Sequence, residues 1–497
     1  MELTRREMLM QIAVTGSVLK CLVATDDPIE WVKYLRMWSK YVHIVNASTH
    51  QRVGVPFRVA TAVLRLGLRE RYRGRVSLRS SDLKAALPPP YEFNSKNDAY
   101  ESQLFEATLT SEGKHTITVR DEKTGEEFTS NPILVSAREP KYKLYFGDIH
   151  IHSAWSNDGR GTPDYNYIYA RDAMNLDFAC LTEHDPTDAI WDRIKDKARE
   201  MYQPGRFATL AAYEWTGHGF RAGHKNVYYR DWDAQAPVFR SNLLEDRTAQ
   251  TTSAFDLWAK LRETGKEVIT IPHHPAAKAF PVPWDEYDPD LQRCVEIYST
   301  WGNSEYPEGP RQIRWEGGSA LGHFVQDALA AGQRLGFVGA TDAHSGRPGY
   351  PAHGRIYADY DYSYWDTGLY TGGVTGIYAE ELTREAVFDA IKNRRCYAAT
   401  GVRIILDFKA DGHWMGEEYK SNDAPHLHVK VIGTAPLESV TVVKNNADHV
   451  RMEGHGPEME FEYGKTEPPK DTDCYYLRVI QTDGEMAWSS PIWVSRN

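Results

Sequence analysis

The sequence predicts a multidomain protein in which a central closed β/α barrel is flanked by two all-β sandwich modules. The chain has 497 residues, which at roughly 150 residues per domain corresponds to about three domains. In the middle of the chain, apolar strand-like runs alternate with amphipathic helical stretches, whereas short strands and turns lie on either side. The predicted units are an N-terminal segment at 1–44, an Ig-like β-sandwich at 45–138, the barrel at 139–402 and a second β-sandwich at 403–497.

The composition limits the classes of protein that need consideration. Hydrophobic residues make up 41% of the chain and charged residues 26%, so the chain can bury a core. The 58 Lys and Arg against 69 Asp and Glu give a net charge of −11, which argues against a general nucleic-acid or anionic-membrane binder. No apolar run reaches the roughly 18 residues of a membrane span. The cysteines are far apart and mostly in strand-like runs, so we expect buried free thiols and no thiolate metal site: Cys21, Cys180, Cys294, Cys396 and Cys474.

The N-terminal segment has two interpretations. The run Thr4-Arg5-Arg6 with the mostly apolar stretch that follows resembles a twin-arginine export signal. However, Lys20 interrupts the apolar stretch, and the residues after it make a poor cleavage site, which favours an ordinary amphipathic helix. We expect a cytoplasmic protein, with export to the periplasm through this N-terminus as the alternative.

The two flanking regions have the same character. Strand-like runs begin at Phe57, Arg75 and Thr116 in the first region and at Arg403, His426, Val440 and Tyr475 in the second. Both regions also close alike, since residues 130–136 are Ser-Asn-Pro-Ile-Leu-Val-Ser and residues 489–495 are Ser-Ser-Pro-Ile-Trp-Val-Ser. Either two similar sandwiches flank the barrel, or the likeness reflects only that proline is tolerated on terminal edge strands.

The middle region contains repeated strand–helix units. Apolar runs at 145–149, 178–182 and 207–213 begin the series, and helical stretches are expected at 164–174 and 189–201. Thr162 can cap a helix that has Pro163 at its first position, and Ser253 and Thr383 can cap two further helices. Repeated units of this kind imply a parallel sheet, and about seven of them suggest a closed barrel.

Imidazole and carboxylate side chains recur where these predicted strands end. Residues i and i+2 of a strand share a face, so His150 and His152, or Asp342 and His344, can converge. One such pair is weak evidence, because it is usually a surface or core pair. Five strand ends that carry these groups favour a metal cluster at the barrel mouth, and donors without thiolate suit zinc, manganese or iron. The residues in question are His150, His152, Asp158, Glu183, His184, Asp185, Glu214, His224, His273, His274, Asp342 and His344.

In this order, the residues resemble the motifs of the polymerase-and-histidinol-phosphatase (PHP) superfamily over about residues 145–350. The flanking sandwiches and the ending at 487–494 look like an uncharacterised branch of it, known as a domain of unknown function. The resemblance implies a distorted (β/α)7 PHP-type barrel with two or three divalent metal ions. It assigns His150, His152, Glu214 and Asp342 to the first ion, Glu214, His224 and His274 to the second, and Asp158, His184 and His344 to the third.

Several assignments within this resemblance stay open. Asp158 lies six residues after His152, where many members have five, so the third ion depends on a bulge in that loop. His273 precedes the residue that matches the family ligand, which leaves it as an acid or as a partner of a ligand. Asp185 either orients a ligand histidine, takes the proton of a water, or caps a helix. Arg347 is a candidate for holding a substrate phosphate, as are Arg160, Arg221, Lys225, Lys278 and His353, with a solvated surface charge as the alternative for each.

The predicted function is metal-dependent hydrolysis of a phosphate monoester or diester by an activated water, on a small or medium phosphorylated substrate. The absence of a Walker-type loop, of a Gly-x-Ser-x-Gly elbow and of a cysteine in a nucleophile setting disfavours other chemistries. An aromatic cluster after residue 274 either lines a pocket or belongs to the core: Trp284, Tyr298, Trp301, Tyr306 and Trp315. The alternatives are amidohydrolase-like cleavage of a carboxyl ester or amide, and a non-catalytic glycan- or partner-binding protein with structural metals. The sequence leaves the oligomeric state open.

Overall fold

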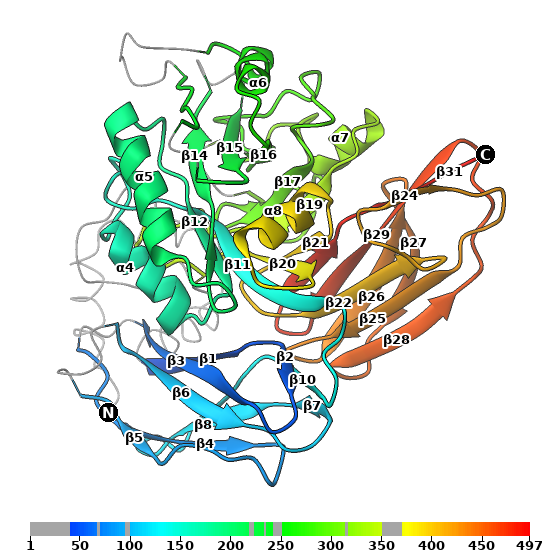
Figure 1. Cartoon of the computed structure of the whole chain (residues 1–497). Helices are drawn as coiled ribbons and strands as arrows, with labels where there is room; N and C mark the ends of the chain where they lie inside the picture. Colours follow the sequence, from blue (N-terminus) through cyan, green and yellow to red (C-terminus); the bar gives the residue numbers. More distant parts are fainter. Residues whose placement is uncertain are drawn as a thin grey trace, which may run out of the picture.

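Three strand-rich regions lie side by side in the computed structural model (Figure 1). The structure describes residues 40–66, 70–94, 100–217, 223–232, 235–241, 251–313, 317–349 and 370–497. Of the predicted N-terminal segment at 1–44, residues 40–44 begin strand β1, and the rest, including the twin-arginine-like run, lies outside the described residues. Among the described helices, none is long and apolar enough to cross a membrane.

The N-terminal region consists of three small sheets around one core. Val59 and Phe105 from one sheet meet Val76 and Val119 from another in this core. The sheets have the orders β1-β3-β6, β2-β10-β7 and β5-β4-β8-β9. Their strands are β1 (Lys40–Ala47), β2 (His50–Arg52), β3 (Pro56–Leu66), β4 (Arg75–Ser80), β5 (Tyr91–Glu92), β6 (Ser102–Thr108), β7 (Gly113–His115), β8 (Ile117–Asp121), β9 (Glu127–Thr129) and β10 (Ile133–Ser136).

The C-terminal region has two sheets, and one of them continues into the central region. One sheet has the order β23-β22-β25-β28, and strand β30 of the other pairs antiparallel with β21 (Cys396–Ala399) of the central region. The strands are β22 (Ile405–Ala410), β23 (His413–Trp414), β24 (Glu418–Lys420), β25 (Leu427–Ile432), β26 (Leu437–Lys444), β27 (Ala447–Glu453), β28 (Glu458–Tyr463), β29 (Thr472–Gln481), β30 (Met486–Ser489) and β31 (Ile492–Ser495).

The two similar closing segments form strands with the same kind of neighbours. Strand β10 pairs parallel with β2 and antiparallel with β7. Strand β31 likewise pairs parallel with β24 and antiparallel with β29. Neither strand is therefore an edge strand, so tolerance of proline at an edge does not account for the shared sequence.

The predicted (β/α)7 barrel is wrong. The central strands divide among several sheets, and β11 (Lys143–Ile151) pairs parallel with β12 (Phe178–Leu181) but antiparallel with β20 (Val374–Ala379). The physical reason is clearest at β14 (Ala211–Trp215) and β15 (His224–Tyr229), where the connection is too short for a crossover helix and the strands pair antiparallel. The other central strands are β13 (Ala208–Thr209), β16 (Val268–His273), β17 (Cys294–Ser299), β18 (Gly302–Asn303) and β19 (Gly336–Gly339).

Five α-helices lie within the described residues, fewer than a seven-unit barrel requires. The predicted caps are confirmed, because the side chains of Thr162, Ser253 and Thr383 each accept a backbone N–H of the first turn. The helix expected at 164–174 is α4 (Pro163–Ile168) followed by the π-helix η2 (Tyr169–Ala173). The others are α5 (Asp188–Met201), α6 (Ala254–Glu263), α7 (Val325–Ala330) and α8 (Arg384–Lys392).

The ends of several central strands nevertheless meet. Isolated parallel bridges join Ile151 to Ala343 and His184 to Glu214, so the end of β11 lies beside the residues after β19, and the residues after β12 lie beside β14. Figure 1 shows these elements gathered in the middle of the central region. The described cysteines are free, as predicted: Cys180, Cys294, Cys396 and Cys474.

Candidate metal centre

Glu214 lies at the middle of a buried cluster of imidazoles. It comes from β14 and is 1% exposed. Its Oε2 lies 3.1 Å from His150 Nε2 and 3.2 Å from His152 Nε2. Its Oε1 lies 2.9 Å from His224 Nδ1 and 3.2 Å from His184 Nδ1. The two carboxylate oxygens therefore face different sets of nitrogens, which is the arrangement of a bridging carboxylate.

Asp342 joins the Oε2 side of this cluster. Its Oδ1 lies 3.3 Å from the Nε2 atoms of both His150 and His152. One nitrogen or oxygen from each of these three residues lies within 4.8 Å of the others. Because Asp342 follows β19 and the two histidines end β11, this group depends on the contact between those strand ends.

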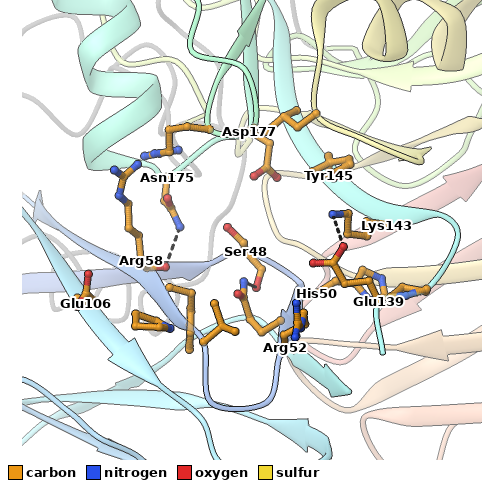
Figure 2. Close-up of a pocket in the computed structure, with 18 residues that line it drawn as sticks. Ser48, His50, Arg52, Arg58, Glu106, Glu139, Lys143, Tyr145, Asn175 and Asp177 are labelled. Atoms are coloured by element: carbon orange, nitrogen blue, oxygen red, sulfur yellow. Dashed lines mark hydrogen bonds and ion pairs between the residues drawn. The ribbon is translucent and has the colours of Figure 1, made fainter. Parts of the chain in front are cut away.

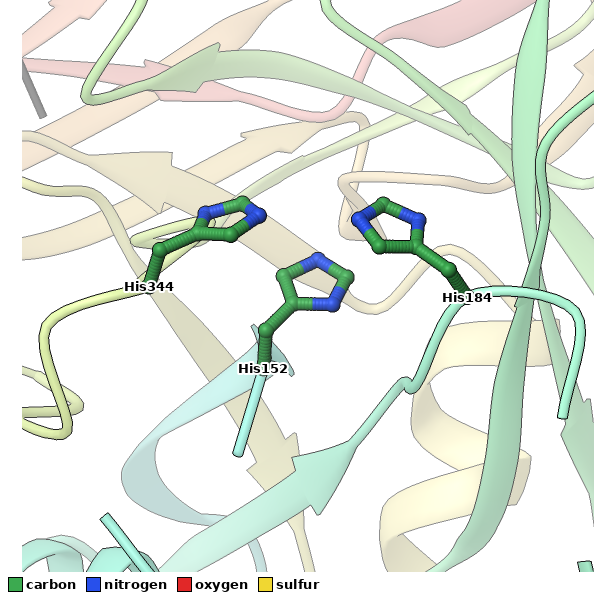
Figure 3. A group of neighbouring side chains, drawn as sticks. All are labelled: His152, His184 and His344. Atoms are coloured by element: carbon green, nitrogen blue, oxygen red, sulfur yellow. The ribbon is translucent and has the colours of Figure 1, made fainter. Parts of the chain in front are cut away.

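A second group forms around three stacked imidazoles. The ring of His152 stacks between those of His184 and His344, with centroids 4.2 Å apart on each side. Figure 3 shows these three rings converging from separate segments. Asp158 Oδ2 lies 3.3 Å from His184 Nε2 and 3.4 Å from His344 Nε2. The loop after His152 thus brings Asp158 to the group to which the PHP resemblance assigns it.

The third group contains both members of the histidine doublet. Ligand atoms of His224, His273 and His274 lie within 4.8 Å of one another, and His273 Nε2 is 3.4 Å from Glu214 Oε1. Consecutive strand residues normally point to opposite faces. Here His274 has a φ of +32°, and this left-handed turn at the strand end directs both rings into the cluster. The structure therefore places His273 among the candidate ligands and not only behind them.

The charges of the cluster shift its pKa values in two directions. Burial would lower the pKa of His150, but Asp342 and Glu296 outweigh it and raise that pKa well above its usual value. Burial, opposed by Glu214, lowers the pKa of His273 to about 3. Burial would raise the pKa of Glu214, yet His184 and His273 hold it well below the usual range. The carboxylate of Glu214 is therefore ionised, and the ring of His273 is neutral and suited to a cation.

The donor set fits a divalent metal ion. Several buried atoms make no well-aligned hydrogen bond within the described residues, among them Glu214 Oε1, Asp342 Oδ1, Asp158 Oδ1 and His224 Nε2. Buried polar atoms are rarely left unpaired unless something else satisfies them. Imidazole nitrogens and carboxylate oxygens without sulfur suit zinc, manganese or iron. The clusters can therefore hold metal.

Residues behind the cluster orient it, and one of them, Glu296, was not indicated by the sequence. Glu296, buried on β17, lies with Oε2 3.0 Å from His150 Nδ1. Trp301 Nε1 donates to Asp342 Oδ2 at 2.5 Å. Glu183 accepts from the hydroxyls of Ser153 and Ser156. A charged residue inside an otherwise apolar strand, as at Glu296, is the signal that could have drawn attention to it.

Asp185 does not cap a helix, because Thr187 caps α5. Its carboxylate accepts from the backbone N–H and the hydroxyl of Ser241, at 3.0 and 2.5 Å. Burial raises the pKa of Asp185 to about 7, opposed by these bonds. Asp185 therefore braces the loop that follows β12, next to His184.

The candidates for substrate contact are scattered. Arg347 is half-buried on the loop that follows Asp342, while Arg160 and Lys278 are exposed. Lys225 is buried, with its ammonium over the ring of Trp215. Arg221, His353 and Trp315 lie outside the described residues. Of the predicted aromatic cluster, Trp301 reaches the site, whereas Trp284 and Tyr298 belong to an apolar core.

The site opens towards Asp158 and His184. Their side chains are 31% and 20% exposed, whereas those of His150 and His273 are fully buried. A molecule from solvent would therefore meet the group of Asp158, His184 and His344 first. The fold and the site together define a β-rich protein with a buried His and carboxylate cluster able to hold metal, open on one side.

Comparisons with known proteins do not identify an activity. A family model described as a protein of unknown function (DUF3604) matches residues 165–279 and 326–430. An uncharacterized protein of Chlamydia trachomatis serovar D is 28% identical over 411 residues, and one of Chlamydia pneumoniae is 27% identical over 412. Each alignment covers 78% of this chain and 62% of the relative. The alignment with the solved structure of a putative beta-galactosidase from Bacteroides fragilis covers 92% of this chain and 73% of that protein, at 9% identity and a TM-score of 0.15.

Proposed function

We propose that this protein is a metal-dependent hydrolase that cleaves a phosphate monoester or diester with two or three divalent ions, manganese, zinc or iron. The observation that carries this proposal is the position of Glu214, whose two oxygens face imidazoles from four separate segments. Structural metal sites are usually closed by their protein ligands, whereas catalytic sites keep an open position. The partial exposure of Asp158 and His184 is consistent with an open site.

The expected charge of the site favours cleavage of a phosphoester over cleavage of a carboxyl ester or amide. Two or three cations at one site match an anionic phosphoryl group, and the resemblance to the PHP superfamily points to the same substrate class. Bound divalent ions would supply a water of lowered pKa as the nucleophile and positive charge for the oxygen that becomes more negative.

The residues of this chain have distinct parts in that reaction. Glu214, His150, His152 and Asp342 would hold and space the ions. With Glu296 ionised, Nδ1 of His150 donates to it, which leaves Nε2 to face the cluster. Trp301 fixes one oxygen of Asp342, so the other stays directed at the histidines.

Metal analysis and a substrate panel on the purified full chain test this function. We expect manganese, zinc or iron to co-purify or to rebind after chelation, and p-nitrophenyl phosphate or bis-p-nitrophenyl phosphate to be hydrolysed faster than p-nitrophenyl acetate. His428→Gln, which alters a histidine–glutamate pair on the C-terminal region away from the cluster, serves as a control and should leave metal content and hydrolysis unchanged. Metal-replete protein that is inert towards both phosphoesters would refute the proposal, and preferential acetate cleavage would favour the amidohydrolase-like alternative.

A further inference from the structure

A second hollow lies between the N-terminal and central regions (Figure 2). Its volume of about 560 Å³ falls in the range of small-molecule sites. Tyr145 lines it and precedes His150 by five residues on β11, which at about 3.3 Å per residue puts roughly 17 Å between the two residues. The hollow is therefore separate from the metal centre, and its walls come from two regions of the chain.

One wall carries two guanidinium groups whose charge is neutralised only in part, since Glu106, which also lines the pocket, lies opposite Arg58 in the pairing of β3 with β6. Arg58 on β3 is exposed, and within the described residues its guanidinium has no ion-pair partner. Arg206 lines the same pocket, donates to the backbone oxygens of Leu176 and Arg171, and forms a long ion pair of 3.7 Å with Asp172. Burial and the charge of Arg58 lower the pKa of Arg206 to about 10. Two guanidinium groups that repel each other in this way form a site for an anion.

Besides Arg58 and Arg206, the lining contains neutral polar groups and the charged groups of Arg52, Lys143, Glu106, Glu139 and Asp177. Lys143 and Glu139 pair with each other at 3.3 Å and cancel. Burial, followed by the charge of Lys143, lowers the pKa of His50 to about 4, so this ring is neutral at neutral pH. Asp177 is buried, and one of its oxygens accepts the backbone N–H of Phe146 at 2.8 Å.

Three further groups, together with Asp177, make the lining suitable for hydroxyls. Figure 2 shows Asp177, Tyr145, Ser48 and Asn175 arranged around the same space. A carboxylate accepts from a hydroxyl, and a phenol, a serine hydroxyl and an amide can both donate and accept. A simple inorganic anion would use Arg58 and Arg206 but would leave these groups, and most of the volume, unused.

We propose that this pocket binds a small polyhydroxylated anion, a sugar acid or a sugar phosphate, with its anionic group against Arg58 and Arg206 and its hydroxyls towards Asp177 and Asn175. Such a ligand contacts strands β2 and β3 of the N-terminal region and the start of β11 at the same time. The pocket requires no metal, so its occupancy is independent of the proposed hydrolase activity.

Calorimetric titration of the full chain tests this site with four probes: D-glucuronate, glucose 6-phosphate, glucose and inorganic phosphate. We expect saturable binding of glucuronate or glucose 6-phosphate with a dissociation constant below about 1 mM, and weaker binding of both glucose and phosphate. Arg58→Gln should weaken the binding about tenfold or more, as the loss of a charged hydrogen bond does. Arg120→Gln, an exposed arginine on β8 outside the pocket, is the matched control.

Each outcome either supports or refutes the proposed binding site. Binding that Arg58→Gln weakens and Arg120→Gln leaves unchanged supports the site, and it should persist after chelation of metal. Absence of binding by all four probes overturns it, as does equal binding by both variants. If inorganic phosphate binds as tightly as glucose 6-phosphate, the ligand's hydroxyls are not recognised, and the proposal of a polyhydroxylated ligand is overturned. If glucose binds most tightly of the four probes, the proposal of an anionic ligand is overturned.

Discussion

Two glutamates of this protein are equally buried, yet their surroundings differ completely. Glu305, between the central and C-terminal regions, receives the guanidinium of Arg478 on both oxygens at 2.9 Å. Tyr476 Oη and Trp488 Nε1 add bonds of 2.6 and 2.7 Å. The carboxylate of Glu214 faces imidazole nitrogens, and within the described residues none of them makes a well-aligned hydrogen bond to its Oε1.

The difference separates a structural group from a functional one. The folded chain supplies a full counter-charge for Glu305, so removing a partner leaves a buried charge uncompensated. The chain supplies Glu214 with groups that bind cations as well as protons, and it leaves atoms of several neighbours unsatisfied. A buried carboxylate of the first kind stabilises the contact between regions, and one of the second kind marks a site for a ligand.

The largest expected effect is that of Glu214→Gln on activity. We expect it to lower kcat/KM for the preferred phosphoester by about a thousandfold, beyond the roughly 10- to 100-fold cost of losing a supporting residue. The amide is a poor bridging ligand, so bound metal measured by elemental analysis should fall as well. Full activity with full metal content in this variant would contradict the role assigned to Glu214.

Arg478→Ala should show the opposite pattern. It leaves Glu305 buried without its cation, which typically costs about 3–5 kcal/mol of folding stability. Chemical denaturation followed by tryptophan fluorescence measures this, and metal content at low temperature should stay at the wild-type value. Arg451→Ala, which removes an exposed arginine from β27, is the control and should cost less than about 1 kcal/mol. If both arginine variants unfold alike, the contrast between the two glutamates does not hold.

Glu296→Gln should have a smaller effect, which falls on metal binding and not on folding. The substitution keeps the size of the side chain but removes the charge that orients His150, which should weaken metal binding about 10- to 100-fold. Competition with a chromogenic chelator measures the affinity, with Glu462→Gln at the exposed pair with His428 as the control. An unchanged affinity would mean that Glu296 only fills space behind His150.

Sequence reasoning reached the cluster but not the fold that carries it. Local signals such as the cap at Thr162 were readable because they depend on a few neighbouring residues. The strand-end positions of His150, Glu214 and Asp342 were readable because polar groups after apolar runs stand out. Strand direction was not, because an apolar run is the same whether its partner is parallel or antiparallel, and β14 and β15 turned out antiparallel.

Backbone geometry was the other feature that the sequence could not supply. Spacing alone predicts that His273 and His274 point apart, but the positive φ of His274 brings them together. Asp342 has a φ of +54°, which likewise directs its carboxylate at the end of a strand. Such conformations are costly for non-glycine residues and are held in place by the surrounding fold. These positive-φ conformations depend on tertiary contacts, so no local sequence pattern predicts them.

The smallest expected effect concerns a third kind of buried polar group, a histidine kept neutral. His43 lies in the N-terminal core, 3.6 Å from Asp121 and edge-on to the ring of Tyr72. Burial, opposed by Asp121, lowers its pKa to about 4 from the usual 6.5. Below pH 6.5, His43 is protonated in the unfolded chain but stays neutral in the folded chain. Folding stability that is present above pH 6.5 is therefore lost as the pH falls towards 4. The share of His43 in the loss between pH 7 and 5.5 should be about 1 kcal/mol; His43→Gln should reduce the loss by that amount, and the exposed His455→Gln should not. Denaturation midpoints at the two pH values measure it, and an equal pH slope in wild type and His43→Gln would show that His43 titrates freely in the folded protein.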